Sequence, residues 1–462
     1  MKQEVLWSLR LGFSRKQAEQ IKTLGIETFL EKSFAADWQV QEPACFEGVA
    51  KTQEELKKEV LAAKEAAKEG KKLIRKEYKK VELEFKAWWL QRMSEAEFPL
   101  HEKMNLFWHN HFVSTFKSVK FPYWIYQQYL IINQHSLGNF KEMTKAMMYS
   151  NAMLKYLSNN KNKNGKINEN LGRELLELFT LGEGHYTESD IKNTALSLAG
   201  LTTSNQKGEY KSKQKNNDIK SVFWKKGNFI IDDVIDIIFE QKNVQYFVTE
   251  KILKWFVYDN QSKDLVKKYG DKFREYNFEI KPFLAFIFKN EYTKNTAGSQ
   301  IKSPLIYAFQ VCNELNINNI SYVNLASFIK NQGMDLFDQP SVKGWEGGKT
   351  WLSTQIYLSR NQLANILTSQ SAASQQQLIN SLRKADPEAT PYQPHIQFDT
   401  QHKAKEIIKE MADNLIFECD DALKNDMSNI LKYDFNPKDE NAEASVFRLF
   451  NFLIKTPEFQ LI

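Results

Sequence analysis

Two segments of the sequence combine histidines and carboxylates with large apolar residues. The first covers residues 107–112 and reads FWHNHF, and the second covers residues 168–188 and reads NENLGRELLELFTLGEGHYTE. Imidazoles and carboxylates that are buried together either bind a metal ion or exchange protons with a substrate. We therefore predict that the two segments converge on one site. The predicted metal ligands are His111, His185 and Glu174, and the predicted catalytic residues are Glu174, Glu177 and His109.

The nitrogen and oxygen donors of these residues suit a divalent transition metal such as Zn²⁺, Fe²⁺ or Mn²⁺. Their spacing does not match HExxH or another pattern that is diagnostic of a metal. A second interpretation needs no metal: each histidine hydrogen-bonds to the backbone, and the carboxylates pair with Arg173. We expect Arg173 to be an internal clamp that holds Glu169 or Glu177 by bidentate hydrogen bonds.

Helices are predicted to position these residues. Leucines recur through residues 171–181 at helical spacing, which predicts one apolar stripe. In residues 98–115, His111 shares the apolar face of Trp108, whereas His109 points almost the opposite way on a regular helix. Two long apolar stripes of one domain usually pack together, and this is the reason for expecting a single site.

A glycine-rich segment could shape the same site. Residues 338–352 read DQPSVKGWEGGKTWL and are predicted to be non-helical. They do not form a P-loop, because Lys343 stands where that motif requires its first glycine. A glycine-rich turn still lets the backbone approach a ligand closely, with Trp345 and Trp351 as walls. The predicted substrate-binding residues are Asn110, Arg173, Trp345 and Lys349.

The predicted fold is mostly α, a large multi-helical single assembly in which residues 1–462 form one domain. Residues 51–93 are strongly periodic and rich in Lys and Glu, which predicts a long charged helix, or a helical hairpin bent near Gly70. We expect this arm to be a solvated packing element. Residues 204–228 and 370–404 are polar and are predicted to be irregular insertions.

Composition limits the function classes. The chain has 63 Lys and Arg against 57 Asp and Glu, a mild excess of +6 that permits an anionic substrate but predicts no nucleic-acid binding. Its three cysteines are far apart, so a reducing compartment fits. We expect a cytoplasmic protein with no membrane span, because no signal peptide and no apolar run of about 18 residues is evident.

Long stretches of the chain resemble a bacterial family named only as domain of unknown function 1800. They are LRLGFS near the start, FPLHEKMNLFWHNHFVST (98–115), LGNFKEMTKAMMYSNAMLKYLSN (137–159), INENLGRELLELFTLGEGHYTESDI (167–191), KSPL (302–305) and GMDLFDQPSVKGWEGGKTWLSTQIYLSR (333–360). The polar positions of the family motifs match His109, Asn110, His111, Glu169, Asn170, Arg173, Glu174, Glu177, His185 and Trp345. One departure is Asn217-Asp218, where the family pattern has a His-Asp pair.

The resemblance implies no particular activity, cofactor or fold. Its members are similar to proteins often encoded beside a second family, which resembles sulfatases. The resemblance therefore implies a sulfatase-like protein as a partner. Many members look exported. Three function classes compete. The first is a metal-dependent or carboxylate-based enzyme, hydrolytic or oxidative, that acts on a saccharide-like or peptide-like substrate. The alternative is a non-catalytic helical interaction partner that docks through residues 51–93, and nucleic-acid binding is least favoured.

Overall fold

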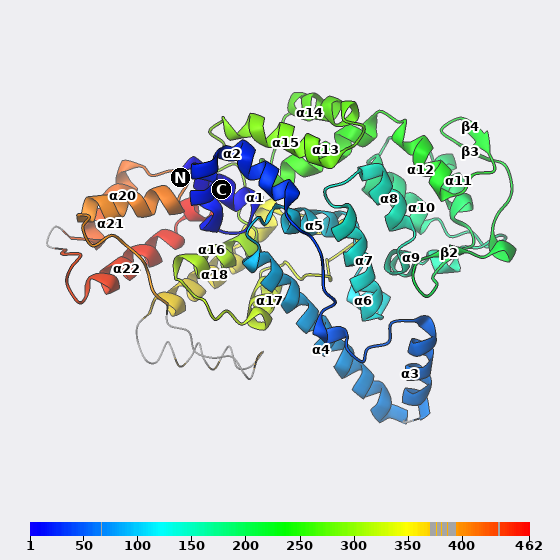
Figure 1. The fold of residues 1–462 in the computed structure, drawn as a ribbon, viewed down its shortest axis with the longest axis horizontal. Coiled ribbons are helices and arrows are strands. Elements are labelled where there is room, and N and C mark those ends of the chain that lie inside the picture. Colours follow the sequence, from blue (N-terminus) through cyan, green and yellow to red (C-terminus); the bar gives the residue numbers. More distant parts are fainter. Residues whose placement is uncertain (66, 370–375, 377–379, 381–385, 387–393, 433–434) are drawn as a thin grey trace.

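Helices account for most of the chain, as the sequence predicts (Figure 1). The structure is a computed structural model that describes residues 1–65, 67–369, 376, 380, 386, 394–432 and 435–462. In those ranges, strands occur only as two short antiparallel pairs. They are β1 (Leu201–Thr202) with β2 (Glu209–Tyr210), and β3 (Lys220–Val222) with β4 (Lys225–Gly227). The segment 204–228, expected to be irregular, therefore contains three short strands.

The largest apolar core joins helices from distant parts of the sequence, and it buries Trp7, Trp108 and Phe179 completely or almost so. Side-chain caps such as Asn139 and Thr187 define where several of these helices begin. The contributing helices are α1 (Gln3–Leu11), α2 (Ala18–Ala35), α5 (Leu100–His111), α7 (Pro122–His135), α8 (Phe140–Met148), α9 (Asn151–Tyr156), α10 (Asn170–Glu174), α11 (Glu188–Leu198), α12 (Ile231–Phe239), α13 (Asn243–Phe256), α14 (Lys263–Glu275) and α15 (Ile280–Tyr292).

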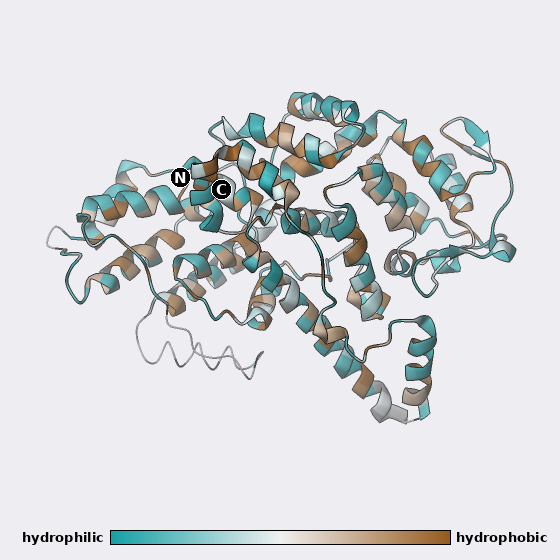
Figure 2. Cartoon of the chain, in the orientation of Figure 1, coloured by the Kyte–Doolittle hydropathy of each residue, from teal (hydrophilic) through white to brown (hydrophobic). Residues whose placement is uncertain are grey.

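A helical hairpin projects from this body (Figure 1). It consists of α3 (Gln53–Glu65) and α4 (Ala67–Glu95), so the hairpin form of the predicted arm is observed. α3 ends at Glu65 and α4 begins at Ala67, a few residues before Gly70, which lies inside α4. Figure 2 shows α3 as mostly hydrophilic, whereas Phe85 and Trp89 of α4 are buried in a second core. That core also includes residues of α6 (Phe116–Val119) and α17 (Tyr322–Asn331).

A third core closes the far end of the molecule, where α16 (Pro304–Glu314) meets the C-terminal helices. These are α18 (Thr354–Thr368), α20 (Ala404–Leu415), α21 (Asp421–Ile430) and α22 (Ala442–Ile454). The segment 370–404, expected to be irregular, lies largely outside the described residues. Within the described ranges, no helix combines the length and apolar character that crossing a membrane requires.

Candidate functional site

A cavity of about 500 Å³ lies between α5, the second half of α13 and the glycine-rich segment. Segments far apart in the sequence build its walls. The lining residues are Lys103, Leu106, Phe107, Asn110, His111, Lys251, Lys254, Trp255, Asp259, Gln300, Ile301, Ser303, Ile306, Pro340, Ser341, Lys343, Gly344, Trp345, Glu346, Gly347, Gly348, Trp351 and Ile462. Such a concave site with aromatic walls and a few polar groups is typical of small-molecule binding.

Positive side chains outnumber negative ones around this cavity. The four lysines are Lys103, Lys251, Lys254 and Lys343, and the two acidic side chains are Asp259 and Glu346. Asp259 is already engaged, since its carboxylate accepts a hydrogen bond from the Ile301 N–H at 3.0 Å. Trp255, Trp345 and Trp351 add flat apolar surface to the same walls.

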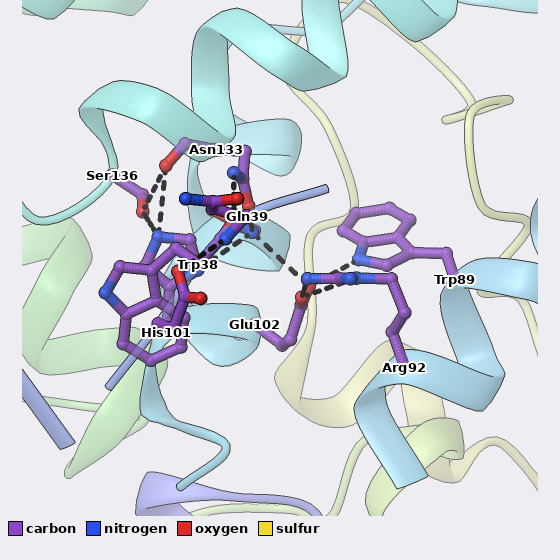
Figure 3. Close-up of polar contacts among 10 residues, drawn as sticks. Trp38, Gln39, Trp89, Arg92, His101, Glu102, Asn133 and Ser136 are labelled. Carbon is purple, nitrogen blue, oxygen red and sulfur yellow. Dashed lines mark hydrogen bonds and ion pairs between the residues drawn. The ribbon is translucent and has the colours of Figure 1, made fainter. Parts of the chain in front are cut away.

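A buried polar network holds the start of α5 (Figure 3). The Glu102 carboxylate accepts hydrogen bonds from the Trp89 indole at 2.8 Å and from Nε of Arg92 at 3.0 Å. Next to it, Nε2 of His101 lies 3.0 Å from the carbonyl oxygen of Asn133. Burial lowers the pKa of His101 to about 3, so its ring is neutral at pH 7. The network fixes α5 against α4 and α7, and with it the face that lines the cavity.

His109 and Asn110 anchor the glycine-rich wall to α5. Nε2 of His109 accepts a hydrogen bond from the Phe337 N–H at 3.1 Å, and burial lowers the pKa of His109 to about 3. The Asn110 amide accepts from the Trp345 N–H at 2.6 Å and donates to the Trp345 carbonyl at 3.3 Å. Gly344 has a φ of +82°, and a Cβ there would lie 2.4 Å from the Asn110 side-chain oxygen. Only glycine fits this close approach.

His111 and Lys251 meet backbone carbonyls of a π-helix, Leu175–Thr180, which continues α10. Nε2 of His111 donates to the Phe179 carbonyl at 3.0 Å. Nζ of Lys251 donates to the Leu178 carbonyl at 2.8 Å and lies 3.3 Å from Nδ1 of His111. π-Turns inside helices occur frequently at functional sites. Here the π-helix presents two carbonyls towards the end of α5 and the wall of the cavity.

Burial changes the protonation of the lysines in this wall. Burial lowers the pKa of Lys251 to about 7, against a smaller opposite effect of Glu250. Burial also lowers the pKa of Lys103 to about 7, although its ammonium donates to the Gly12 carbonyl at 2.8 Å. The pKa of His111 lies well below its usual range, because of burial and then the nearby charge of Lys251. Both lysines therefore change charge near neutral pH.

The structure does not bring the predicted catalytic and metal-binding residues together. His109 and His111 lie on opposite sides of α5, and each ring is hydrogen-bonded to a backbone group. His185 is exposed in the loop before α11. Over the part of the chain that the structure describes, no group of three or more His, Cys, Asp and Glu residues could hold a metal ion. The predicted ligand set of His111, His185 and Glu174 is therefore not assembled, because the Phe179 carbonyl holds Nε2 of His111 and the His185 side chain is exposed.

The carboxylates of the second segment do not line the cavity. Burial and then the charge of Glu177 raise the pKa of Glu174, while Arg173 and Lys343 act in the opposite direction. Lys343, whose charge acts on Glu174, is a residue of the cavity wall. Glu177 itself accepts a hydrogen bond from the Tyr186 hydroxyl at 2.8 Å.

Arg173 is a surface residue and not an internal clamp. Its two terminal nitrogens donate to the carboxylate of Glu188 at 3.0 and 3.1 Å, and Glu169 lies 3.5 Å away. The predicted pairing with Glu169 is present, whereas Glu177 pairs elsewhere. Arg173 is 37% exposed and lines no part of the cavity. Of the other predicted substrate-binding residues, Asn110 and Trp345 line the cavity, and Lys349 is exposed beside it.

Several lining residues were not predicted from the sequence, above all Lys103, Lys251 and Lys254. The sequence does contain an indication of two of these lysines, Lys251 and Lys103. Lys251 falls between Val248 and Trp255 at helical spacing, and Lys103 lies within the almost wholly buried α5. A lysine on an apolar helical face needs a partner or a ligand, because burying an ammonium alone is costly. Asp259 follows the end of α13 and carries no comparable signal.

Comparison with known families gives a match over almost the whole chain. Residues 4–461 match the family described as Protein of unknown function (DUF1800). The chain belongs to this family. The DUF1800 resemblance carried by the sequence motifs is confirmed over essentially the whole chain. No curated protein and no solved structure matches the chain.

Proposed function

We propose that the cavity binds a small anionic molecule with a flat, apolar part, and that this DUF1800 protein is an enzyme acting on that molecule. One observation carries the proposal: four lysines and three tryptophans converge on a single cavity that holds two acidic side chains. A carboxylate, sulfate or phosphate group of the ligand would pair with the lysines. The ring faces of Trp255, Trp345 and Trp351 would cover a planar group or a sugar face.

Lys103, which is buried, and Lys251, which is partly buried, strengthen this proposal. Lys103 and Lys251 donate to backbone carbonyls, which leaves their charge without a neutralising carboxylate at hydrogen-bond distance. A buried charge is stable only when it is paired, so an anion in the cavity would stabilise both ammonium groups. Lys254 and Lys343 are exposed and would attract the anion at the entrance.

Glu174 and Glu177 would supply the proposed acid–base chemistry, since the charge of Lys343 in the cavity wall acts on Glu174. The raised pKa of Glu174 makes this residue a better proton donor near neutral pH than an ordinary glutamate. Glu177 is its neighbour on the same helical segment and contributes to that raised pKa. This arrangement supports a carboxylate-based enzyme acting on an acidic saccharide-like or peptide-like molecule. Among the residues that the structure describes, no group of three or more His, Cys, Asp and Glu side chains could hold a metal ion.

The test compares two probes of the same shape, 2-naphthoate and its neutral amide 2-naphthamide, by isothermal titration calorimetry. We expect 2-naphthoate to bind more tightly. In the double variant Lys254→Gln, Lys343→Gln, we expect affinity for 2-naphthoate to fall about tenfold and affinity for 2-naphthamide to stay the same. The matched control is Lys161→Gln, Lys166→Gln, which changes two exposed lysines outside the cavity wall. Equal affinity of wild type for the two probes would refute the proposal.

A further inference from the structure

We infer that Lys251 is a nucleophilic amine that forms an imine with a carbonyl group of the molecule bound in the cavity. The inference rests on the proposed function, since it assigns a chemical class to the same ligand: an aldehyde or ketone that also carries an anionic group. It names a different reaction centre from Glu174 and Glu177. The observations that carry it are the position of Lys251 in the cavity wall and the geometry of its hydrogen bonds.

Lys251 is held in place by its surroundings. It lies on α13 between Val248 and Trp255, on the side of the helix that packs towards the cavity. Its Nζ is 2.8 Å from the Leu178 carbonyl oxygen, and the ring centroid of Phe247 is 4.4 Å away. A lysine whose amine is fixed and partly desolvated is the type used for Schiff-base chemistry.

The imidazole of His111 defines the second contact of this amine. Its Nε2 must donate, because the atom facing it at 3.0 Å is the Phe179 carbonyl oxygen. In the neutral ring the other nitrogen, Nδ1, is then an acceptor, and it lies 3.3 Å from Nζ of Lys251. A neutral amine has two N–H groups and one lone pair. The Leu178 carbonyl and His111 Nδ1 accept from those two N–H groups, which leaves the lone pair for an electrophile.

The proposed reaction is balanced without another reactant. The lone pair of Nζ attacks the carbonyl carbon, and one Nζ–H proton passes to the carbonyl oxygen to give a carbinolamine. The hydroxyl group then leaves as water with the remaining Nζ–H proton while the C=N bond forms, so the products are the imine and one water molecule. Hydrolysis by water reverses both steps. The anionic group of the ligand would pair with Lys254 or Lys343, which line the same cavity.

Two other lysines of the cavity serve as internal comparisons. Lys103 is 3% exposed, and its Nζ is held by the Gly12 carbonyl at 2.8 Å with the Phe13 ring centroid at 4.9 Å. Lys254 lies three residues after Lys251 on α13, and its side chain is exposed. Lys103 is fixed but buried more deeply than Lys251, and the exposed Lys254 is not held in this way. We therefore expect both to react more slowly than Lys251.

The experiment is reductive trapping of the full chain with 4-formylbenzoate and sodium cyanoborohydride, followed by peptide mass spectrometry at several time points. Cyanoborohydride transfers hydride to the imine carbon, and water protonates the nitrogen, so a stable 4-carboxybenzyl-lysine remains. We expect Lys251 to be modified about tenfold faster than Lys103, Lys254 or the exposed Lys161. We also expect 2-naphthoate to slow the modification of Lys251 but not that of Lys161, which lies outside the cavity wall. In Lys251→Arg, the fast modification should disappear.

The outcomes separate this inference from the proposed function. If Lys251 reacts no faster than Lys161 while 2-naphthoate still binds, the imine is refuted and the anion site stands. If Lys251 reacts fast but equally fast with the neutral 4-formylbenzamide, the imine stands and the anion site is refuted. Peptide mass spectrometry of the modified wild-type protein alone distinguishes these outcomes, so the test does not depend on the folding of Lys251→Arg.

Discussion

Three consecutive side chains at the end of α5 each hold a different part of the chain. His109 binds the Phe337 N–H, Asn110 binds both backbone groups of Trp345, and His111 binds the Phe179 carbonyl. Helical spacing separates His109 from His111, so the predicted shared site would need a turn or a helix end between them. The sequence cannot show that backbone groups occupy their ring nitrogens, because those groups come from segments roughly 70 and 230 residues away.

The Asn110 amide is the most direct connection between α5 and the glycine-rich wall. Asn110→Ala removes two hydrogen bonds and leaves the Trp345 N–H without its acceptor. We expect a loss of about 1–3 kcal/mol in the free energy of unfolding, together with weaker 2-naphthoate binding. Urea denaturation and calorimetry measure the two effects. Unchanged stability and affinity would show that the contact does not position the wall.

Arg173 is expected to contribute little to stability, because Arg173 and Glu188 both reach solvent. Arg173→Lys should change the melting temperature by no more than about 1 °C. The matched control is Arg360→Lys, since Arg360 is fully buried and donates to Gln460 and to the Lys302 carbonyl. Differential scanning calorimetry should show a clear decrease for the control. An equally large decrease in melting temperature for Arg173→Lys would show that Arg173 is an internal clamp, as predicted from the sequence.

At the scale of elements, the segment 168–181 shows what periodicity can and cannot predict. The recurring leucines predict a helix with one buried face; Leu171, Leu175 and Leu181 are indeed buried, whereas Leu178 is partly buried. Periodicity does not distinguish an α-turn from a π-turn, and Leu175–Thr180 is a π-helix. The difference matters because carbonyls of this segment accept hydrogen bonds from Lys251 and His111.

The helical hairpin of α3 and α4 separates the two main function classes. Its tip carries exposed Leu61 and Leu73, which favours docking to another protein, but no residue of the tip lines the cavity. We expect replacement of residues 57–77 by a short Gly-Ser linker to leave 2-naphthoate affinity within about twofold of wild type, because the buried base of α4 starts at Val81. Calorimetry measures the affinity. If this variant folds but no longer binds 2-naphthoate, the hairpin contributes to the binding site, which would contradict the prediction.

At the scale of the whole molecule, the sequence predicts a mostly α fold and the family, but not the position of the cavity. Its walls come from α5, α13, residues 300–306 and residues 340–351, and no local pattern relates these segments. The helices themselves are predictable because each buries a periodic apolar face. Their packing into three cores, which places Lys251 beside His111, depends on contacts between distant residues.

Burial of Lys103 couples stability to pH. Its pKa is about 7 in the folded chain and about 10.4 when unfolded, so the unfolded state holds more protons between these values. Its contribution to the free energy of unfolding therefore rises with pH in this window, by up to ~1.4 kcal/mol per pH unit. We expect wild type to gain stability relative to Lys103→Met between about pH 7.5 and pH 9. Urea denaturation at both pH values measures this difference, and a constant difference would contradict it.

The most direct test of the anion-binding cavity is a crystal structure of the protein with 6-bromo-2-naphthoate, in which anomalous scattering locates the bromine. We predict that the bromine lies inside the cavity, with the ring against Trp345 or Trp255. We predict that the carboxylate lies within hydrogen-bond distance, about 2.7–3.2 Å, of a lysine ammonium of the wall. A bound bromonaphthoate that lies elsewhere on the protein, with this cavity filled only by solvent, would contradict the proposed function.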